Sequence, residues 1–222
     1  MRRFVGLFIG WLSAWASLGV GTAGAADTRQ FTTICDCVYT NARCDGKFRW
    51  AVKTDTTPPP NSGIKKVTPT TIAHWPDLAP DPQTKTYQHD APRFPAETKW
   101  YELAGRVTRI KADSDGDLHI QLQDANGPSR GVNVIVEVPD GPPWCGVRSN
   151  AFSLTQEQPP FDAPNELTLL RTNAVIRVVG RPFYDGQHAV TGHKPNRRMG
   201  NDKDRNVTIW EVHPVMNLQI VK

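Results

Sequence analysis

Carboxylates and histidines recur two residues apart in the second half of the chain. Asp117 precedes His119 in this way, and Glu211 precedes His213. In an extended strand, residues i and i+2 point to the same face, so each pair places a carboxylate beside an imidazole. Such pairs suit a divalent metal site or a general acid–base pair. The alternative interpretation is that each pair belongs to the polar, solvated face of its strand.

Further titratable residues extend this candidate site. Asp185 and His188 flank a Gly-Gln turn, and Glu137 stands among valines in an apolar segment. If the segments are neighbours in space, their carboxylates and imidazoles converge, and a divalent metal is the cofactor for which they provide ligands. The candidate catalytic residues are therefore Asp117, His119, Asp185, His188, Glu211 and His213. The candidate metal ligands are Asp117, His119, Glu211 and His213.

A basic segment over residues 193–206 offers a second kind of site. In a β-barrel that binds oligonucleotides, such a loop contacts the phosphate backbone while an aromatic ring stacks on a base. The candidate ligand-binding residues are Tyr184, Lys194, Arg197, Arg198 and Trp210. The alternative is an ordinary solvated loop. The whole chain has 26 basic and 22 acidic residues, and removal of the predicted signal peptide leaves 24 and 22. This near balance argues against a surface made wholly for nucleic acid.

The N-terminal residues predict export. Two arginines precede the apolar run Phe4–Val20, and the small residues Ala23–Ala26 follow it. This order is typical of a signal peptide over residues 1–26, cleaved after Ala25 or Ala26. The alternative is a membrane anchor, because the run is close to the shortest spanning length. Cleavage leaves a periplasmic or extracellular protein without a stable membrane span.

The four cysteines are Cys35, Cys37, Cys44 and Cys145. An exported chain in an oxidising compartment forms disulfides from them. A bond between Cys35 and Cys37 would close a very tight ring, so one of these two pairs with Cys44 and the other with Cys145. A four-cysteine zinc site is the alternative, although this spacing is uncommon among zinc ligands.

The segment before residue 101 is expected to lack most regular structure. Nine of the nineteen prolines lie between Thr54 and Trp100, and proline removes amide donors and fixes φ. This segment is predicted to be an extended connection over other structure, with a short strand near Lys65–Val67. Before it, Lys47–Thr54 alternates apolar and polar residues, which predicts a half-buried strand.

Strand signals dominate the rest of the chain. Alternating runs at 103–110 and 118–123 surround an Asp- and Gly-rich turn and predict a hairpin. A calcium-binding loop fits the same aspartates less well, because Leu118 stands at the position of the required glycine. Further strands are expected at 132–138, 174–180 and 207–221, with a short helix within 165–173.

These elements predict an all-β fold. Five strands with one short helix between the third and the fourth fit a small Greek-key barrel similar to the oligonucleotide/oligosaccharide-binding (OB) barrel. A β-sandwich is the alternative. The expected organisation is a signal peptide at 1–26, a disulfide-bearing, Pro-rich extension at 27–100 and an OB-like barrel domain at 101–222.

Several segments resemble the recurring segments of a family of uncharacterised exported bacterial proteins. They are Trp50–Thr54 (W-x-V-K-T), Asp117–His119 (D-x-H), Phe183–His188 (F-Y-D-x-x-H) and Trp210–Val215 (W-E-[IV]-H-P-V). The resemblance covers most of the chain after the signal peptide, but the family implies no established activity. Its members often carry a cysteine shortly after the last strand, which this chain lacks, so their disulfide pairing does not carry over directly.

Two functional hypotheses follow. The first is an exported β-barrel that binds a macromolecular or polymeric ligand, such as nucleic acid or another anionic polymer. The second is a metal-dependent phosphodiester hydrolase that uses the histidine and carboxylate cluster. The hairpin turn is similar to that of thermonuclease-like barrels through Asp115-Gly116-Asp117, but the arginine and glutamate catalytic pair of that family has no matching positions. Motifs of serine hydrolases, P-loop enzymes and dinucleotide-binding proteins are absent.

Overall fold

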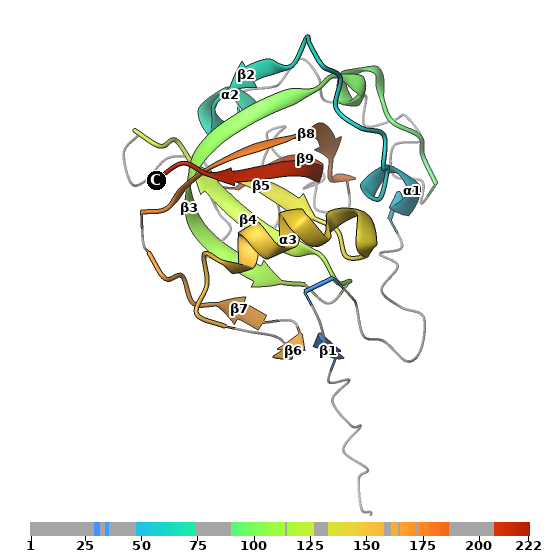
Figure 1. The fold of residues 1–222 in the computed structure, drawn as a ribbon. Coiled ribbons are helices and arrows are strands. Elements are labelled where there is room, and N and C mark those ends of the chain that lie inside the picture. Colours follow the sequence, from blue (N-terminus) through green and yellow to red (C-terminus); the bar gives the residue numbers. More distant parts are fainter. Residues whose placement is uncertain are drawn as a thin grey trace, which may run out of the picture.

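Five strands form the centre of the protein. The computed structural model describes residues 29–31, 34–35, 48–73, 90–113, 115–126, 133–157, 161–163, 165–171, 173–186 and 207–222. The central strands are β3 (Tyr101–Ala112), β4 (Leu118–Gln123), β5 (Asn133–Val138), β8 (Val175–Tyr184) and β9 (Val207–Ile220). They curve around one another, with the long strand β3 along one side of the molecule (Figure 1).

These strands close into a barrel. Their order is β3-β4-β5-β9-β8, and β8 pairs with β3 again. The pairing of β5 with β9 is parallel, and the other four are antiparallel. The helix α3 (Cys145–Phe152) lies between β5 and β8 along the chain. This arrangement confirms the predicted OB-like Greek-key barrel and excludes the sandwich.

Strand β3 bends so that it can pair with two neighbours. Its first half pairs with β8 and its second half with β4, and the register shifts between Val107 and Arg109. Such an irregularity increases the local twist and bend of a strand. Gly105 lies just before this irregularity, where a Cβ atom would approach Leu122 and the carbonyl of Gln123 to 2.9 Å. The close approach of β4 therefore leaves no room for a side chain at this position.

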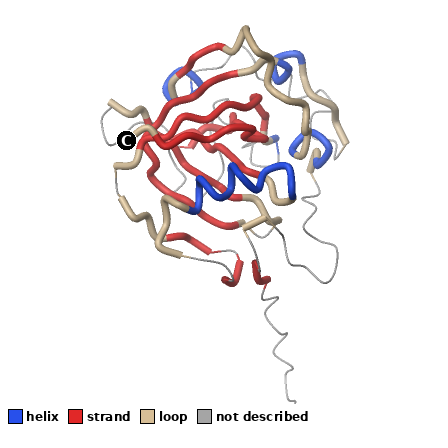
Figure 2. The backbone as a smooth tube through the Cα atoms, in the orientation of Figure 1, coloured by secondary structure: helices blue, strands red, loops and turns tan. Residues whose placement is uncertain are grey.

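The barrel interior is apolar, and some strands are covered on both faces. Strands β4 and β5 are buried along their whole length. The fully buried apolar side chains include Leu103, Ile110, Leu118, Ile120 and Leu122. Helix α2 (Pro69–Ala73) contacts β3, β4, β5 and β9 and contributes the buried Ile72. Figure 2 shows how short the helices are beside the strands.

The segment before the barrel follows the prediction only in part. Residues 55–64 contain neither helix nor strand, and β2 (Lys65–Val67) adds in parallel to β3. The predicted strand at 47–54 is wrong: α1 (Trp50–Lys53) is a single helical turn after Arg49, whose φ of 52° is left-handed. The buried Arg49 guanidinium bonds to Glu97, in the 3-10 helix η3 (Pro95–Thr98), and to the carbonyl of Ala91. These tertiary bonds override the local alternation.

The predicted helix within 165–173 is also wrong. Strand β7 (Asn165–Leu167) occupies this region and pairs with the end of β3. The helix occurs earlier, as α3, directly after the 3-10 turn η4 (Pro142–Trp144). Proline is favoured in the first turn of a helix, which explains why the Pro-Pro pair starts this helical segment. The local sequence at 165–173 could not predict this strand, because β7 is stabilised by pairing with β3, which is distant in the sequence.

A disulfide joins the N-terminal part of the chain to α3. It connects Cys35 with Cys145, which confirms that Cys145 pairs with one of the two closely spaced cysteines. Cys37, Cys44 and the predicted signal peptide lie outside the described residues.

Two more short strands, β1 (Arg29–Phe31) and β6 (Phe161–Ala163), pair with each other. Within the described residues, no helix has the length and apolar character needed to cross a membrane.

Replacement of Gly180 by alanine should destabilise the barrel. A Cβ atom on this β8 residue would lie 2.5 Å from both the Pro214 carbonyl oxygen and Val212 Cγ1, so β9 must shift. We expect Gly180→Ala to lower the free energy of unfolding by about 2–3 kcal/mol in urea denaturation. The control is Gly146→Ala in α3, where nothing lies within 4 Å of the added atom; this variant should be neutral or slightly stabilising. Equal stabilities of the two variants would contradict the packing argument.

Candidate functional site

Three adjacent strands bring the sequence-predicted pairs together. Strand β5 lies between β4 and β9. His119 on β4 is directly opposite Glu137 on β5. On the other side, Val136 is level with Val212, which places Glu137 beside His213. The two pairs predicted from the sequence therefore lie on either side of Glu137.

Glu137 contacts an imidazole with each of its oxygens. Oε1 lies 3.0 Å from His119 Nδ1, and Oε2 lies 2.8 Å from His213 Nδ1. His213 Nε2 also lies 3.4 Å from Asp117 Oδ2, and Nδ1 lies 4.0 Å from Glu211 Oε2. Asp117, His119, Glu137, Glu211 and His213 thus form one connected cluster, here called the acidic cluster.

The acidic cluster is buried. Asp117 and His213 are 0% exposed, and Glu211 is 1% exposed. The interpretation of these residues as a solvated strand face is therefore wrong. Burial of charged groups is costly unless the groups are paired or bind a metal. The cluster thus requires a compensating charge.

Hydrogen bonds do not satisfy all of these groups. Among the described residues, neither carboxylate oxygen of Asp117 and neither ring nitrogen of His213 has a hydrogen-bond partner of acceptable geometry. The 2.8 Å contact between His213 and Glu137 is close enough for electrostatic attraction, but its angles are not those of a hydrogen bond. A buried polar group without a partner costs about 1–3 kcal/mol. Unpaired groups that face one another indicate a ligand.

Lys53 supplies a positive charge at the edge of the acidic cluster. Its ammonium lies 3.7 Å from Glu137 Oε2 and 3.9 Å from Asp115 Oδ2. The helical turn α1 places Lys53 beside Glu137. The sequence prediction did not include Lys53 among the site residues. Its side chain is 14% exposed, whereas those of Asp113 and Asp115 are 24% and 29% exposed. The edge formed by Lys53, Asp113 and Asp115 is therefore more accessible to solvent than the acidic cluster itself.

Two groups of potential metal ligands share Glu137. Asp117, Glu137 and His213 form the inner group, and Asp113, His119 and Glu137 form the outer group. Each residue offers one ligand atom, and the atoms of a group lie within 4.8 Å of one another. Three of the four predicted metal ligands, Asp117, His119 and His213, belong to these groups, whereas Glu211 only borders the inner group through His213.

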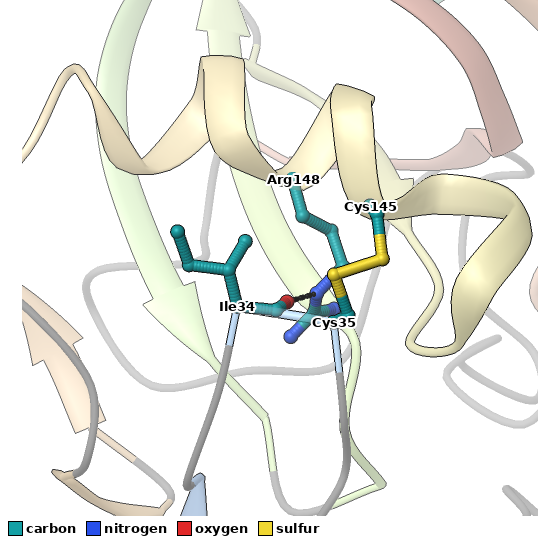
Figure 3. The surroundings of a disulfide bond; sticks show 4 residues. All are labelled: Ile34, Cys35, Cys145 and Arg148. Carbon is teal, nitrogen blue, oxygen red and sulfur yellow. Dashed lines mark hydrogen bonds between the residues drawn. A yellow bond between two sulfur atoms is a disulfide. The ribbon is translucent and has the colours of Figure 1, made fainter.

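The backbone around the acidic cluster is held by Arg148. Its buried guanidinium donates to the carbonyls of Gly116 and Val138, which are the neighbours of Asp117 and Glu137. It also donates to Ile34, the residue before Cys35 (Figure 3). Figure 3 shows Arg148 on α3, beside the disulfide. One side chain thus connects the disulfide region to both buried acids.

Phe183 on β8 supports the cluster from another side. Its ring centroid lies 5.5 Å from that of His213, and the Lys53 ammonium and the Arg49 guanidinium lie 5.6 Å and 4.9 Å from it. Cations are attracted to the face of an aromatic ring. Phe183 therefore limits the movement of both His213 and Lys53.

The electrostatics follow from burial and from the opposite charges nearby. Burial, reinforced by the charge of Asp115, raises the pKa of Asp117 well above its usual value. Burial opposes ionisation of Glu137 as well, but Lys53 and the two imidazoles outweigh it and hold its pKa well below the usual range. Burial would lower the pKa of Lys53, yet the carboxylates around it, led by Glu137, raise it. Glu137 and Lys53 are therefore charged at neutral pH, and Asp117 takes up a proton readily.

Of the other predicted site residues, Asp185, Tyr184 and Trp210 lie among the described residues. Asp185 is buried, its N–H donates to the Ile209 carbonyl, and it belongs to neither ligand group found among the described residues. Trp210, which with Tyr184 was predicted to stack on a base, is 0% exposed and packs against Tyr184, with their ring centroids 5.2 Å apart. The remaining predicted residues, His188, Lys194, Arg197 and Arg198, lie outside the described residues.

Of the residues that the candidate set omitted, Glu137 carried a visible signal. It is the only charged residue in the apolar run Val134–Val138, and a lone carboxylate in a strand buried on both faces must have a buried partner. Asp113 and Asp115 were interpreted as turn residues. The turn exists, since Gly116 N–H donates to the Asp113 carbonyl, but their side chains also face the acidic cluster.

Comparison with known proteins does not assign a function. No family model matches the chain, and no curated protein matches it. Matches among solved structures include two of asparaginyl-tRNA synthetase from Entamoeba histolytica, one in complex with asparaginyl-adenylate. Each is 14% identical, with a TM-score of 0.31, and covers 56% of this chain and 21% of the synthetase chain. A likeness of this size assigns neither a family nor a function to the chain. The resemblance to exported bacterial proteins stays a prediction.

Replacement of Asp117 by asparagine should stabilise the metal-free protein. Because the pKa of Asp117 is raised, its contribution to stability is fully present below the ordinary carboxyl pKa and is lost as pH rises through the folded-state value. Asparagine resembles the protonated acid. We expect Asp117→Asn to raise the free energy of unfolding by about 1–3 kcal/mol near pH 8, and by much less near pH 4. Urea denaturation in EDTA at both pH values measures the difference.

The control for this prediction is Glu166→Gln. Glu166 is half exposed and pairs with Arg109 at the surface, so its effect should stay within about 0.5 kcal/mol at both pH values. Lower stability of Asp117→Asn near pH 8 would show that the Asp117 carboxylate is a stabilising partner of His213 instead.

Proposed function

We propose that this protein is an exported β-barrel binding module whose ligand is a divalent transition-metal ion. The inner group of Asp117, Glu137 and His213 binds it. One observation carries the proposal: Asp117 and His213 are fully buried, face each other at 3.4 Å, and make no acceptable hydrogen bond among the described residues. A cation between them would satisfy both groups.

The donor set indicates the class of metal. An imidazole with two carboxylates suits Zn²⁺, Mn²⁺ or Fe²⁺, whereas Mg²⁺ and Ca²⁺ prefer sites made only of oxygen atoms. Three protein ligands leave at least one coordination position open, as in zinc sites that do chemistry. Glu211 lies 4.0 Å from His213 and borders this group.

A purely structural ion pair is the competing explanation. In that arrangement a protonated His213 would lie between Glu137 and Asp117 and donate from both ring nitrogens. Neither nitrogen has the required geometry among the described residues. Removal of one partner of a buried ion pair is strongly destabilising, whereas loss of a metal ligand removes metal binding and relieves charge repulsion in the metal-free protein.

Metal binding is tested by titration of the purified full chain with Zn²⁺. We expect binding that raises the melting temperature; at a free Zn²⁺ concentration of about 100 times Kd, the stabilisation is about 2.7 kcal/mol. Asp117→Asn and His213→Gln should weaken binding by at least about 100-fold, because each removes a ligand. Glu166→Gln should bind like the unmodified protein.

Failure of Zn²⁺, Mn²⁺ and Fe²⁺ to bind the unmodified chain would overturn this proposal. Equal affinity in the Asp117→Asn variant would place the metal elsewhere on the chain.

A second candidate function is metal-dependent phosphodiester hydrolysis. It is favoured by Lys53, whose charged ammonium lies beside Glu137 at the accessible edge of the acidic cluster. A bound metal ion supplies Lewis-acid activation, and a fixed ammonium can stabilise the negative charge that develops on a phosphate. Nucleic acid is the corresponding polymer, and the basic residues Lys194, Arg197 and Arg198 are the proposed contacts for its phosphates.

Hydrolysis of bis(p-nitrophenyl) phosphate by the Mn²⁺-loaded protein tests this second candidate. We expect Lys53→Met to lower kcat by about 100-fold with its metal content unchanged, because a charge-stabilising group is lost. The control is Lys66→Met, at an ammonium that is 83% exposed and pairs only with Glu102 among the described residues. Hydrolysis no faster than that of free Mn²⁺, or an undiminished rate in Lys53→Met, would rule this activity out.

A further inference from the structure

We infer that the acidic cluster binds two divalent ions, with Glu137 as the ligand that bridges them. The inner ion is the one described above, and the outer ion lies among Asp113, His119 and Glu137. This inference rests on the proposed metal-binding function and extends it. Both ligand groups are present among the described residues, and Glu137 belongs to each.

The orientation of Glu137 is that of a bridging ligand. Its position on the central strand directs one oxygen toward β4 and the other toward β9. Oε1 contacts His119 at 3.0 Å, and Oε2 contacts His213 at 2.8 Å. A carboxylate with one oxygen facing each of two imidazoles has the arrangement of a bridging ligand. In two-metal sites the ions lie about 3.5–4 Å apart, a separation that one carboxylate can span.

Each imidazole also has a carboxylate of its own. Asp113 Oδ2 lies 3.6 Å from His119 Nδ1, and Asp117 Oδ2 lies 3.4 Å from His213 Nε2. Two ligands with metal bonds of about 2.0–2.2 Å are roughly 3 Å apart around one ion. On the outer side, Glu137 Oε1 and Asp113 Oδ2 both face Nδ1 of His119, as two ligands of one ion do. On the inner side, Glu137 faces Nδ1 and Asp117 faces Nε2 of His213. The inner ion takes one of these two nitrogens, and one ligand atom from each of the three residues lies within 4.8 Å of the others. Among the described residues, the buried Asp117 carboxylate and His213 imidazole have no hydrogen-bond partner, so these two groups have room for the inner ion as a partner.

Two ammonium groups lie among the carboxylates of this region. Lys53 lies 3.7 Å from Glu137, and Lys111 lies 2.6 Å from Asp113. The outer ion would take the place of the Lys111 ammonium beside Asp113.

The two positions differ in access. Asp117 and His213 are fully buried, whereas the side chain of Asp113 is 24% exposed. The outer ion should therefore exchange with solvent more readily, and its ligand Asp113 must release Lys111. We expect the inner ion to bind more tightly and the outer ion more weakly.

A one-ion site would use His119 differently. His119 Nδ1 lies within hydrogen-bond distance of Glu137, and Gln121 Nε2 lies 3.4 Å from His119 Nε2. In this arrangement His119 would donate to Glu137 and only orient it toward a single ion. The side-chain amide of asparagine places an N–H near the position of His119 Nδ1, whereas the amide of glutamine lies one carbon farther from the backbone. His119→Asn therefore keeps the donor to Glu137 and His119→Gln loses it, so only a positioning role predicts different results for the two variants.

The experiment counts Mn²⁺ ions on the full chain, with elemental analysis and electron paramagnetic resonance. We expect two ions per chain and a spin-coupled signal, because a shared carboxylate holds the ions close together. Asp113→Asn, His119→Asn and His119→Gln should each retain one ion and lose the coupling. Asp113 is partly exposed, so its variant should fold even if a His119 variant does not. Glu166→Gln, at a surface carboxylate, should keep both ions and the coupling.

Three results would overturn the inference in different ways. One ion in the unmodified chain, with affinity kept in His119→Asn and lost in His119→Gln, makes His119 a positioning residue of a one-ion site. Two ions without spin coupling place the second ion away from Glu137. No bound ion overturns the proposed metal-binding function itself, together with this inference.

Discussion

The contacts of Glu137 with two imidazoles organise the buried part of this protein. A carboxylate at the centre of an apolar strand must be compensated, and His119, His213 and Lys53 all approach it. This requirement explains why the helical turn α1, far from the barrel strands in sequence, is held against β9. It also explains why the buried carboxylates and imidazoles of the five barrel strands lie on β4, β5 and β9.

Two buried arginines hold the surroundings of this centre. Arg148 donates hydrogen bonds to the carbonyls of the residues next to Asp117 and Glu137. Arg49, which directly precedes the helical turn with Lys53, bonds to Glu97. Arg148 bonds to backbone carbonyls, and Arg49 bonds to backbone carbonyls and to the Glu97 carboxylate. Both therefore position the acidic cluster without being part of it. The disulfide at Cys35 and Cys145 lies beside the first of them (Figure 3). A rigid site of this kind suits metal binding, because ligands must be held in place before the ion arrives.

Buried charge and metal binding are physically linked here. Burial raises the pKa of both Asp117 and Glu137, but at Glu137 the charge of Lys53 and the two imidazoles outweigh burial, so the pKa values of the two acids shift in opposite directions. Glu137 has the compensating cation and imidazoles, whereas Asp117 has another carboxylate, Asp115, beside it. A divalent cation would remove this imbalance, with release of a proton from Asp117. The poorly compensated charge at Asp117 therefore fits the proposed metal site.

Local sequence patterns determined the strands, the hairpin and the two histidine–carboxylate pairs. Alternation over 118–123 and 207–221, and the Asp- and Gly-rich turn, act between near neighbours, so they are readable in the chain itself. The OB-like order of strands also followed from their number and from the helix between the third and fourth. Tertiary structure alone decided the rest. The parallel register of β5 and β9 brings Glu137 to His213, and the bond between Arg49 and Glu97 turns Lys53 into the cluster, because pairing between distant segments leaves no local periodic signal.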